Sequence, residues 1–308
     1  MLKRIFLASP RGFCAGVDRA IEIVRTALER YGPPLYVYHE IVHNPYVVAE
    51  LRQKGAVFVD ALDEVPAGAR AIYSAHGVSP EIRDAAASRA LRIIDATCPL
   101  VTKVHNEALR FAQAGDHILL VGHKGHDEVV GTMGETPSHV SLVSDIEEAQ
   151  TVDVPDPSRV ALLTQTTLSV DDTRGIIEVL QQRFPALHFP AKDDICYATQ
   201  NRQLAVKELA EHAELVIVLG GSNSSNSQRL REVAEQFGVD AHLVNNVAEV
   251  QPAWLEGVES VGITSGASTP EFLVEEAVTY FQSLGASEVC LLETVQERVH
   301  FALPKDLG

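Results

Sequence analysis

Short apolar stretches alternate with helical patterns along the whole chain, and this alternation limits the fold more than any other feature. The stretches Leu35–Tyr38, His117–Gly122 and Leu215–Leu219 have the length and branched side chains of buried strands. Between such strands, Ser79 stands before Pro80, which is the N-cap and first-turn pair that often begins a helix. Strands that alternate with helices form parallel sheets with helices on both faces. The sequence therefore predicts an α/β fold.

Three of the four cysteines occupy the same local position, just before a predicted helix. Cys14 lies in a glycine-containing strand-to-helix loop, Cys98 precedes Pro99, and Cys196 precedes a helix from about residue 199. We expect each thiol to have a lowered pKa, because a helix N-terminus favours the thiolate that binds iron or zinc. Taken singly, each cysteine is equally consistent with a small buried side chain.

The cysteine separations of 84 and 98 residues indicate three structural units that share one centre. We expect the units to span residues 1–97, 98–195 and 196–285, with a closing segment over 286–308. The strand near residues 3–8 is assigned to the first unit. The strand near 91–95 lies just before the boundary at residue 97, and we expect it to pair with the strands of the second unit. The closing segment is expected to form a strand followed by extended chain.

Polar loops follow the predicted strands, at the edge where parallel sheets bind ligands. The loop Ser222–Ser227 is dense in hydroxyl and amide groups and opens a helix, whose free N–H groups can bind phosphate. It lacks the lysine-containing Walker pattern. His43 and His76 also follow strands, so they are interpreted either as phosphate donors or as ordinary loop histidines.

His126 and Glu128 suggest a pair that handles protons. A carboxylic acid in an enclosed site has a raised pKa and can donate a proton near neutral pH. The alternative for Glu128 is a carboxylate that stabilises a helix N-terminus. The segment His123–His126 could also hold zinc, but its two histidines lack the spacing of an established zinc helix.

Composition excludes several functional classes. The chain has 25 Lys and Arg against 42 Asp and Glu, a net charge of −17, which argues against binding nucleic acid or an anionic membrane. No apolar run reaches the roughly 18 residues of a membrane-spanning helix. The N-terminal apolar stretch is too short for a secretory signal, and four unpaired cysteines make no disulfide framework. We expect a cytoplasmic protein.

Three thiolates at long spacing suit an iron–sulfur cluster or a zinc site. In a four-iron cluster, three ligands leave one iron open to substrate as a Lewis acid. Cys290 lies inside an apolar strand and is interpreted as a structural residue. Three other readings stay open at this point: a zinc-dependent diphosphate hydrolase, a non-catalytic iron–sulfur sensor, and a nucleotide-binding α/β protein with buried cysteines.

Several segments together resemble the LytB family of 4-hydroxy-3-methylbut-2-enyl diphosphate reductases, the last enzymes of the non-mevalonate isoprenoid pathway. The resemblance extends over the whole chain, including the tail at Phe301–Pro304. The segments that carry it are Pro10–Val17, Ser74–Ser79, Asp95–Pro99, Gly125–Glu128, Gln165–Ser169, Asp194–Thr199 and Asn223–Ser227.

The resemblance implies three similar small α/β domains in pseudo-threefold arrangement around a central [4Fe-4S] cluster. It implies that the cluster has three cysteine ligands, Cys14, Cys98 and Cys196. The implied catalytic residues are Glu128, Thr166 and His126, and the first two would deliver a proton to the substrate. The implied substrate-binding residues are His43, His76, His126, Thr166, Ser224, Ser225, Asn226 and Ser268.

The implied reaction removes the allylic hydroxyl of 4-hydroxy-3-methylbut-2-enyl diphosphate as water at the open iron of the cluster. Two electrons pass through the cluster, and protonation gives isopentenyl or dimethylallyl diphosphate. The resemblance also implies a flavodoxin or a ferredoxin as electron donor. Nucleic acid and membrane are not expected partners.

Overall fold

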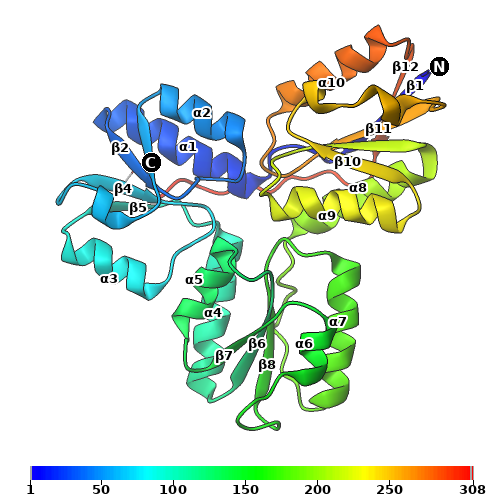
Figure 1. Cartoon of the computed structure of the whole chain (residues 1–308). Helices are drawn as coiled ribbons and strands as arrows, with labels where there is room; N and C mark the ends of the chain where they lie inside the picture. Colours follow the sequence, from blue (N-terminus) through cyan, green and yellow to red (C-terminus); the bar gives the residue numbers. More distant parts are fainter. Residues whose placement is uncertain (1, 306, 308) are drawn as a thin grey trace. The chain divides into compact units, whose positions relative to one another are not determined.

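The computed structural model of the chain describes residues 2–305 and residue 307 (Figure 1). These residues divide into two compact units, each of which is described by itself. Unit 1 comprises the described residues up to Asp18 together with His43–Ala49 and Tyr197–His300. Unit 2 comprises Arg19–Val42, Glu50–Cys196 and the described residues from Phe301 onward.

Unit 1 is built on one parallel sheet with the strand order β10-β9-β11-β1-β12. Every residue of β9 is buried, as expected for a central strand that is covered on both faces. The strands are β1 (Arg4–Ser9), β9 (Leu215–Leu219), β10 (Asp240–Val244), β11 (Ser260–Ser265) and β12 (Glu288–Glu293).

Helices cover both faces of this sheet. Helices α8 (Tyr197–His212) and α9 (Ser225–Gln236) pack on one face, where Leu209 and Leu230 join the apolar side chains of the strands. Helix α10 (Glu271–Ser283) packs on the other face through Phe281. Two short 3₁₀ helices, η2 (Val247–Glu249) and η3 (Pro252–Leu255), follow β10.

Unit 2 contains two parallel sheets. The first has the order β3-β2-β4-β5, and α3 (Pro80–Ser88) packs against it through Ala86. Its strands are β2 (Leu35–Tyr38), β3 (Ala56–Val59), β4 (Arg70–Tyr73) and β5 (Arg92–Asp95). The other elements in this part of the chain are α1 (Ala15–Tyr31), α2 (Pro45–Gln53) and η1 (Leu62–Glu64), and α1 and α2 each contribute some residues to unit 1.

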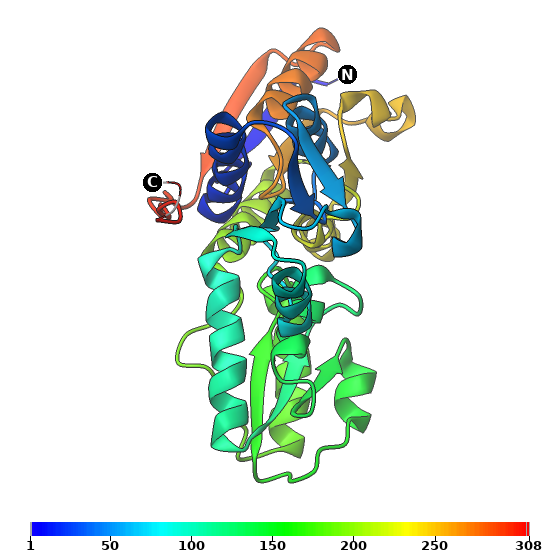
Figure 2. The ribbon, with the colours of Figure 1, turned by 90° about the vertical axis from the view of Figure 1, so that its left-hand side faces the viewer.

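The second sheet of unit 2 has the order β7-β6-β8 and helices on both faces (Figure 1). Side chains of α4 and α5 form one core with this sheet, and those of α6 and α7 form another. Figure 2 shows α4 running along the strands. The elements are α4 (Pro99–Ala114), β6 (His117–Val121), α5 (Asp127–Glu135), β7 (Val140–Val143), α6 (Ile146–Thr151), β8 (Val160–Thr164) and α7 (Val170–Arg183).

The predicted α/β class with parallel sheets is confirmed, and the predicted tail strand is β12. The grouping of two strands differs from the expectation. Strand β1 pairs with β11 and β12 near the end of the chain, and β5 pairs with β4. A parallel neighbour is reached through a crossover, so adjacency in the sequence does not identify it. The domain boundaries at residues 97, 195 and 285 stay predictions.

Within the residues that the structure describes, no helix has both the length and the apolar character needed to cross a membrane.

Candidate active site

The three sheets repeat one arrangement around the cysteines that precede helices. The backbone N–H of Cys14 donates to the carbonyl of Ala267 (3.2 Å), that of Cys98 to Ala75 (2.9 Å) and that of Cys196 to Thr166 (3.0 Å). Each accepting residue lies two positions after the last residue of a strand, namely β11, β4 and β8. Each cysteine loop is therefore bound to a polar loop of its own sheet.

Strand pairing explains why these loops meet. The strand that leads to each cysteine loop runs parallel to the strand that leads to its acceptor. For Cys14 the pair is β1 with β11, and for Cys98 it is β5 with β4. For Cys196 a single parallel bridge between His188 and Ala161 of β8 takes this role. Because the strands are parallel, both loops of each pair emerge at the same edge of the sheet.

All four cysteines carry thiols, and each is partly buried. Burial raises the pKa of the Cys14 thiol, although Arg202 and the N–H groups of Val17 and Gly16 act to lower it. The expectation of a lowered pKa at this helix start is thus wrong for Cys14 in the metal-free protein, because loss of hydration outweighs the helix terminus. Metal binding replaces the proton, so the thiol still qualifies as a ligand. Cys290 packs against an apolar cluster of unit 1, as its strand position predicts.

Glu128 and Thr166 form a buried polar contact in unit 2. Their exposed fractions are 2% and 4%. The Thr166 N–H donates to Oε1 of Glu128 at 2.7 Å, and its Oγ1 donates to Oε2 at 3.0 Å. Burial, and to a smaller extent the charge of Asp194, raise the pKa of Glu128 to about 7 against the opposing effect of the two hydrogen bonds from Thr166. The carboxyl is therefore able to hold a proton near neutral pH, as the sequence predicts.

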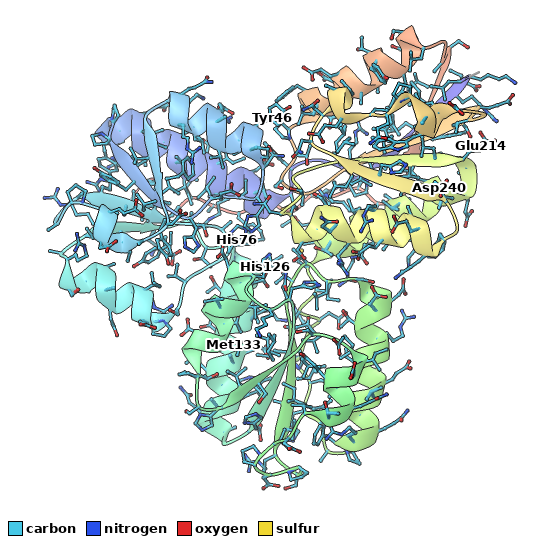
Figure 3. The ribbon with its side chains drawn as sticks, viewed as in Figure 1. Tyr46, His76, His126, Met133, Glu214 and Asp240 are labelled. Atoms are coloured by element: carbon cyan, nitrogen blue, oxygen red, sulfur yellow. The ribbon has the colours of Figure 1, made fainter. Side chains whose placement is uncertain are left out.

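His126 is the N-cap of α5, and its Nδ1 accepts from the Glu128 N–H at 3.2 Å. This contact places the ring proton on Nε2. The ring of His76 meets that of His126 edge-on at 5.8 Å (Figure 3). Asp127 contacts two histidines. Its Oδ1 is 2.9 Å from Nδ1 of His39, and its Oδ2 is 3.8 Å from Nδ1 of His76.

A lysine holds the segment that leads to Cys196. Lys103, on α4, donates from Nζ to the carbonyls of Lys192 (2.6 Å) and Asp193 (3.0 Å) and to Oδ1 of Asp194 (2.8 Å). The other oxygen of Asp194 accepts from the N–H of Thr164 at 3.0 Å. The helix that begins after Cys98 is thereby fixed to the chain that precedes Cys196.

The serine loop of unit 1 is arranged as a helix N-terminus. Ser224 is the N-cap of α9; its Oγ accepts from the N–H of Ser227 at 3.3 Å and from the Ser227 Oγ at 3.0 Å. A Cβ added at Gly220 or Gly266 would come within 2.2 or 2.0 Å of the Ser227 hydroxyl, so this packing requires glycine at both positions. Such a terminus, with Ser225 and Asn226 in its first turn, can bind an anion.

Asn226 gives this loop an unsatisfied polar group. The residue is 4% exposed, and neither its Oδ1 nor its Nδ2 has a hydrogen-bond partner among the described residues. A buried amide without partners costs roughly 1–3 kcal/mol, so such a group in a native structure points to a missing ligand or water. Nearby, the Ser268 hydroxyl donates to the carbonyl of His43 at 3.0 Å.

The structure thus places the predicted site residues in two sets. Three residues were missed by the sequence analysis: Asp127, Lys103 and Arg202 bind site segments, and Arg202 is wholly buried. Their spacing resembles that of ordinary surface charges, so only their closeness to the motifs could have marked them in the sequence. Unit 1 holds Cys14, His43, Ser224, Ser225, Asn226 and Ser268, and unit 2 holds Cys98, Cys196, His76, His126, Glu128 and Thr166.

Comparison with known proteins gives matches to one family. The model of the family described as LytB protein matches residues 5–282. The 4-hydroxy-3-methylbut-2-enyl diphosphate reductase of Mycolicibacterium paratuberculosis is 58% identical over 306 residues, which cover 99% of this chain and 92% of that protein. The reductase of the same name from Leifsonia xyli is 56% identical, with 99% and 91% covered.

Two solved structures share the fold. The E-1-hydroxy-2-methyl-but-2-enyl-4-diphosphate reductase from Plasmodium falciparum has a TM-score of 0.94 and 39% identity, with 100% of this chain and 97% of that chain covered. A second reductase structure, described as the terminal enzyme of the non-mevalonate pathway, has a TM-score of 0.64 and 31% identity, with 92% and 100% covered. By sequence and by fold, this chain belongs to the LytB family.

Proposed function

We propose that the chain reduces 4-hydroxy-3-methylbut-2-enyl diphosphate to isopentenyl and dimethylallyl diphosphate, with a [4Fe-4S] cluster on Cys14, Cys98 and Cys196. In this reaction the allylic C–O bond breaks, two electrons and two protons are consumed, and the oxygen leaves as water. The chain is an oxidoreductase, like its relatives named as this reductase. A flavodoxin or a ferredoxin is the proposed source of the electrons.

One observation carries the proposal: Thr166 joins a proton donor to a cysteine. Its N–H and hydroxyl bind Glu128, and its carbonyl accepts from the N–H of Cys196. A carboxyl group with a pKa of about 7 is suited to general acid catalysis near neutral pH. A non-catalytic sensor would not need a buried acid held next to a thiol ligand.

The donor set fits an iron–sulfur cluster. The three thiols are soft ligands, and each backbone is fixed by the N–H bond to a loop carbonyl. The fourth cysteine, Cys290, packs in an apolar cluster of unit 1, so we assign the cluster three thiolates. When bound, such a cluster would pass on the electrons of the donor one at a time and would offer one iron that can act as a Lewis acid. A cytoplasmic location keeps thiols reduced and suits this assignment.

The remaining site residues bind the substrate in this proposal. Neutral donors hold the diphosphate, because the serine loop lies at the N-terminus of α9 and the buried amide of Asn226 is unpartnered. His126 donates from Nε2, since its Nδ1 already accepts from Glu128. Protonated Glu128 donates a proton to Oγ1 of Thr166 while that hydroxyl passes its own proton to the departing oxygen of the substrate. His43, His76, Ser224, Ser225 and Ser268 complete the proposed diphosphate set.

Metal analysis of anaerobically purified protein tests the proposal. We expect about four iron with sulfide per chain, whereas zinc without sulfide would support the hydrolase instead. Replacing Cys98 with serine should strip the iron and the associated absorbance, because a thiolate ligand is lost. A control substitution of Cys290 with serine should keep both. Unchanged iron in the Cys98→Ser protein would refute the ligand assignment.

A further inference from the structure

Arg202 is the largest fully buried side chain of the described residues, and its side chain has 0% exposure. It lies on α8 in unit 1, six positions after Cys196 in the sequence. Burying a guanidinium is costly unless its donors are satisfied, so its partners reveal what the side chain does. Those partners are main-chain carbonyls and one carboxylate.

The guanidinium binds the loop that ends at Cys14. Its Nε and Nη2 donate to the carbonyl of Gly12 at 3.1 and 2.7 Å, and Nη2 also donates to the carbonyl of Phe13 at 3.2 Å. The peptide group between Phe13 and Cys14 is therefore held at both ends. Arg202 binds its oxygen, and the carbonyl of Ala267 accepts from its N–H at 3.2 Å.

The same guanidinium binds the first turn of α8. Its Nη1 donates to the carbonyl of Ala198 at 3.0 Å, two positions after Cys196. Nη1 also donates to both carboxylate oxygens of Glu297, at 3.1 and 3.3 Å. The planar fork of arginine supplies donors in several directions at once, which the single ammonium of lysine cannot do in the same geometry.

The two charges of this pair meet different surroundings. The Glu297 side chain is 16% exposed and lines a cavity of about 510 Å³ together with Arg11 and Arg298. Water can therefore screen the carboxylate, whereas the guanidinium has no contact with solvent. The Cys14 loop consequently experiences a positive charge that its partner cancels only in part.

We propose that Arg202 is a positioning residue that fixes the Cys14 loop and that, with Glu297, it sets the reduction potential of the group bound by the cysteines. This inference rests on the proposed function. A buried positive charge stabilises the reduced form of a cluster, and a nearby negative charge has the opposite effect. Removal of the two charges should therefore shift the potential in opposite directions.

The test measures the midpoint potential and the rate of iron loss to a chelator in anaerobically purified holoprotein. Arg202→Met should lower the potential and speed iron loss roughly tenfold to a hundredfold, the ratio that corresponds to one or two hydrogen bonds to a charged group. Arg202→Lys keeps the charge, so its potential should stay near that of the parent while iron loss is still faster. Glu297→Gln should raise the potential.

Lys3→Met is the matched control. It also removes one positive charge from unit 1, but the ion pair of Lys3 with Glu259 is exposed, at 61% and 47%. The potential of this variant should equal that of the parent because solvent screens the lost charge. If Arg202→Met does not fold, Glu297→Gln and Arg202→Lys still decide the question.

Three outcomes separate the two proposals. A parent protein without iron overturns the proposed function. A parent with iron whose potential is unmoved by Glu297→Gln, or moved in the same direction by Arg202→Met and Glu297→Gln, overturns the inference alone. Opposite shifts in the two variants, with no shift in the Lys3 control, support it.

Discussion

The loops before Cys14 and Cys196 are each held by one ion pair, but the more buried partner is the cation in the first pair and the carboxylate in the second. In both, a basic side chain on a helix donates to main-chain carbonyls before the cysteine and pairs with a carboxylate. In unit 1 the cation, Arg202, is 0% exposed and its partner is 16% exposed. In unit 2 the carboxylate of Asp194 is 1% exposed, and Lys103 is 26% exposed.

The buried charge beside the cysteine loop is therefore positive in unit 1 and negative in unit 2. A buried cation beside Cys14 favours the gain of electrons at a cluster. The buried carboxylate of Asp194 instead adds to the raised pKa of Glu128 and so favours retention of a proton. Reductive dehydroxylation needs both an electron supply and a proton supply. Under the proposed function, the buried charge of unit 1 would tune the first and that of unit 2 the second.

Replacing Glu128 with glutamine should give the largest effect. The variant cannot donate a proton, so turnover should fall by roughly 10²- to 10⁴-fold, the usual contribution of a general acid. Glutamine can still accept from the Thr166 N–H, so iron content and substrate binding should be kept. Turnover, iron and binding are measured on one preparation. Normal turnover would show that Glu128 is not the proton donor, and the contrast drawn between the two units would then be wrong.

The pH profile gives the next largest effect. Burial raises the pKa of Glu128 to about 7, so the acid form is present below that pH and is lost above it. Turnover should therefore fall with rising pH, approaching tenfold per unit above about pH 7.

The Asp194→Asn variant sharpens this test. Removal of the carboxylate charge should move the basic limb to lower pH, because Asp194 raises the pKa of Glu128. A limb that stays in place would show that burial alone sets the acid. The residual activity of Glu128→Gln should lack the limb altogether.

Replacing Lys103 with methionine should give the smallest effect. The change leaves Asp194 buried without its cation and should lower the free energy of unfolding by about 2 kcal/mol, less than for a fully buried pair because Lys103 is partly solvated. Alkylation of Cys196 in the metal-free protein should also become faster. Thermal or denaturant unfolding measures the loss.

Lys54→Met is a matched control in the same unit, since Lys54 forms an exposed ion pair with Glu50 at 49% and 39%. Its unfolding free energy should change by less than about 0.5 kcal/mol. Equal losses in the two lysine variants would mean that the bonds from Lys103 to the segment before Cys196 contribute nothing to the free energy of unfolding.

Local pattern was enough to predict the elements but not their neighbours. The strands and most helices follow from apolar runs and caps, as at Ser79 and Pro80. The place of β1 in the sheet with β9 to β12 depends on contacts across most of the chain, which periodicity does not encode. Helices α5 and α6 were not predicted as elements, because neither begins with the proline that marks the start of α2 and α3, and α6 has only 6 residues.

The electrostatics of the site show the same division. The raised pKa of Glu128 was predicted because enclosure acts in one direction on an acid. For Cys14, burial and the helix terminus act in opposite directions, and only the structure shows that burial is the larger. Arg202 and Lys103 read as solvated basic residues until folding places carbonyl groups around them.

Thr166 connects the backbone of Cys196 to the carboxyl group of Glu128. Because its peptide carbonyl binds the Cys196 N–H while its N–H and hydroxyl bind Glu128, any disturbance at that cysteine is transmitted to the acid through one residue. If Cys196 holds the proposed cluster, loss of its iron would disturb proton delivery together with electron delivery.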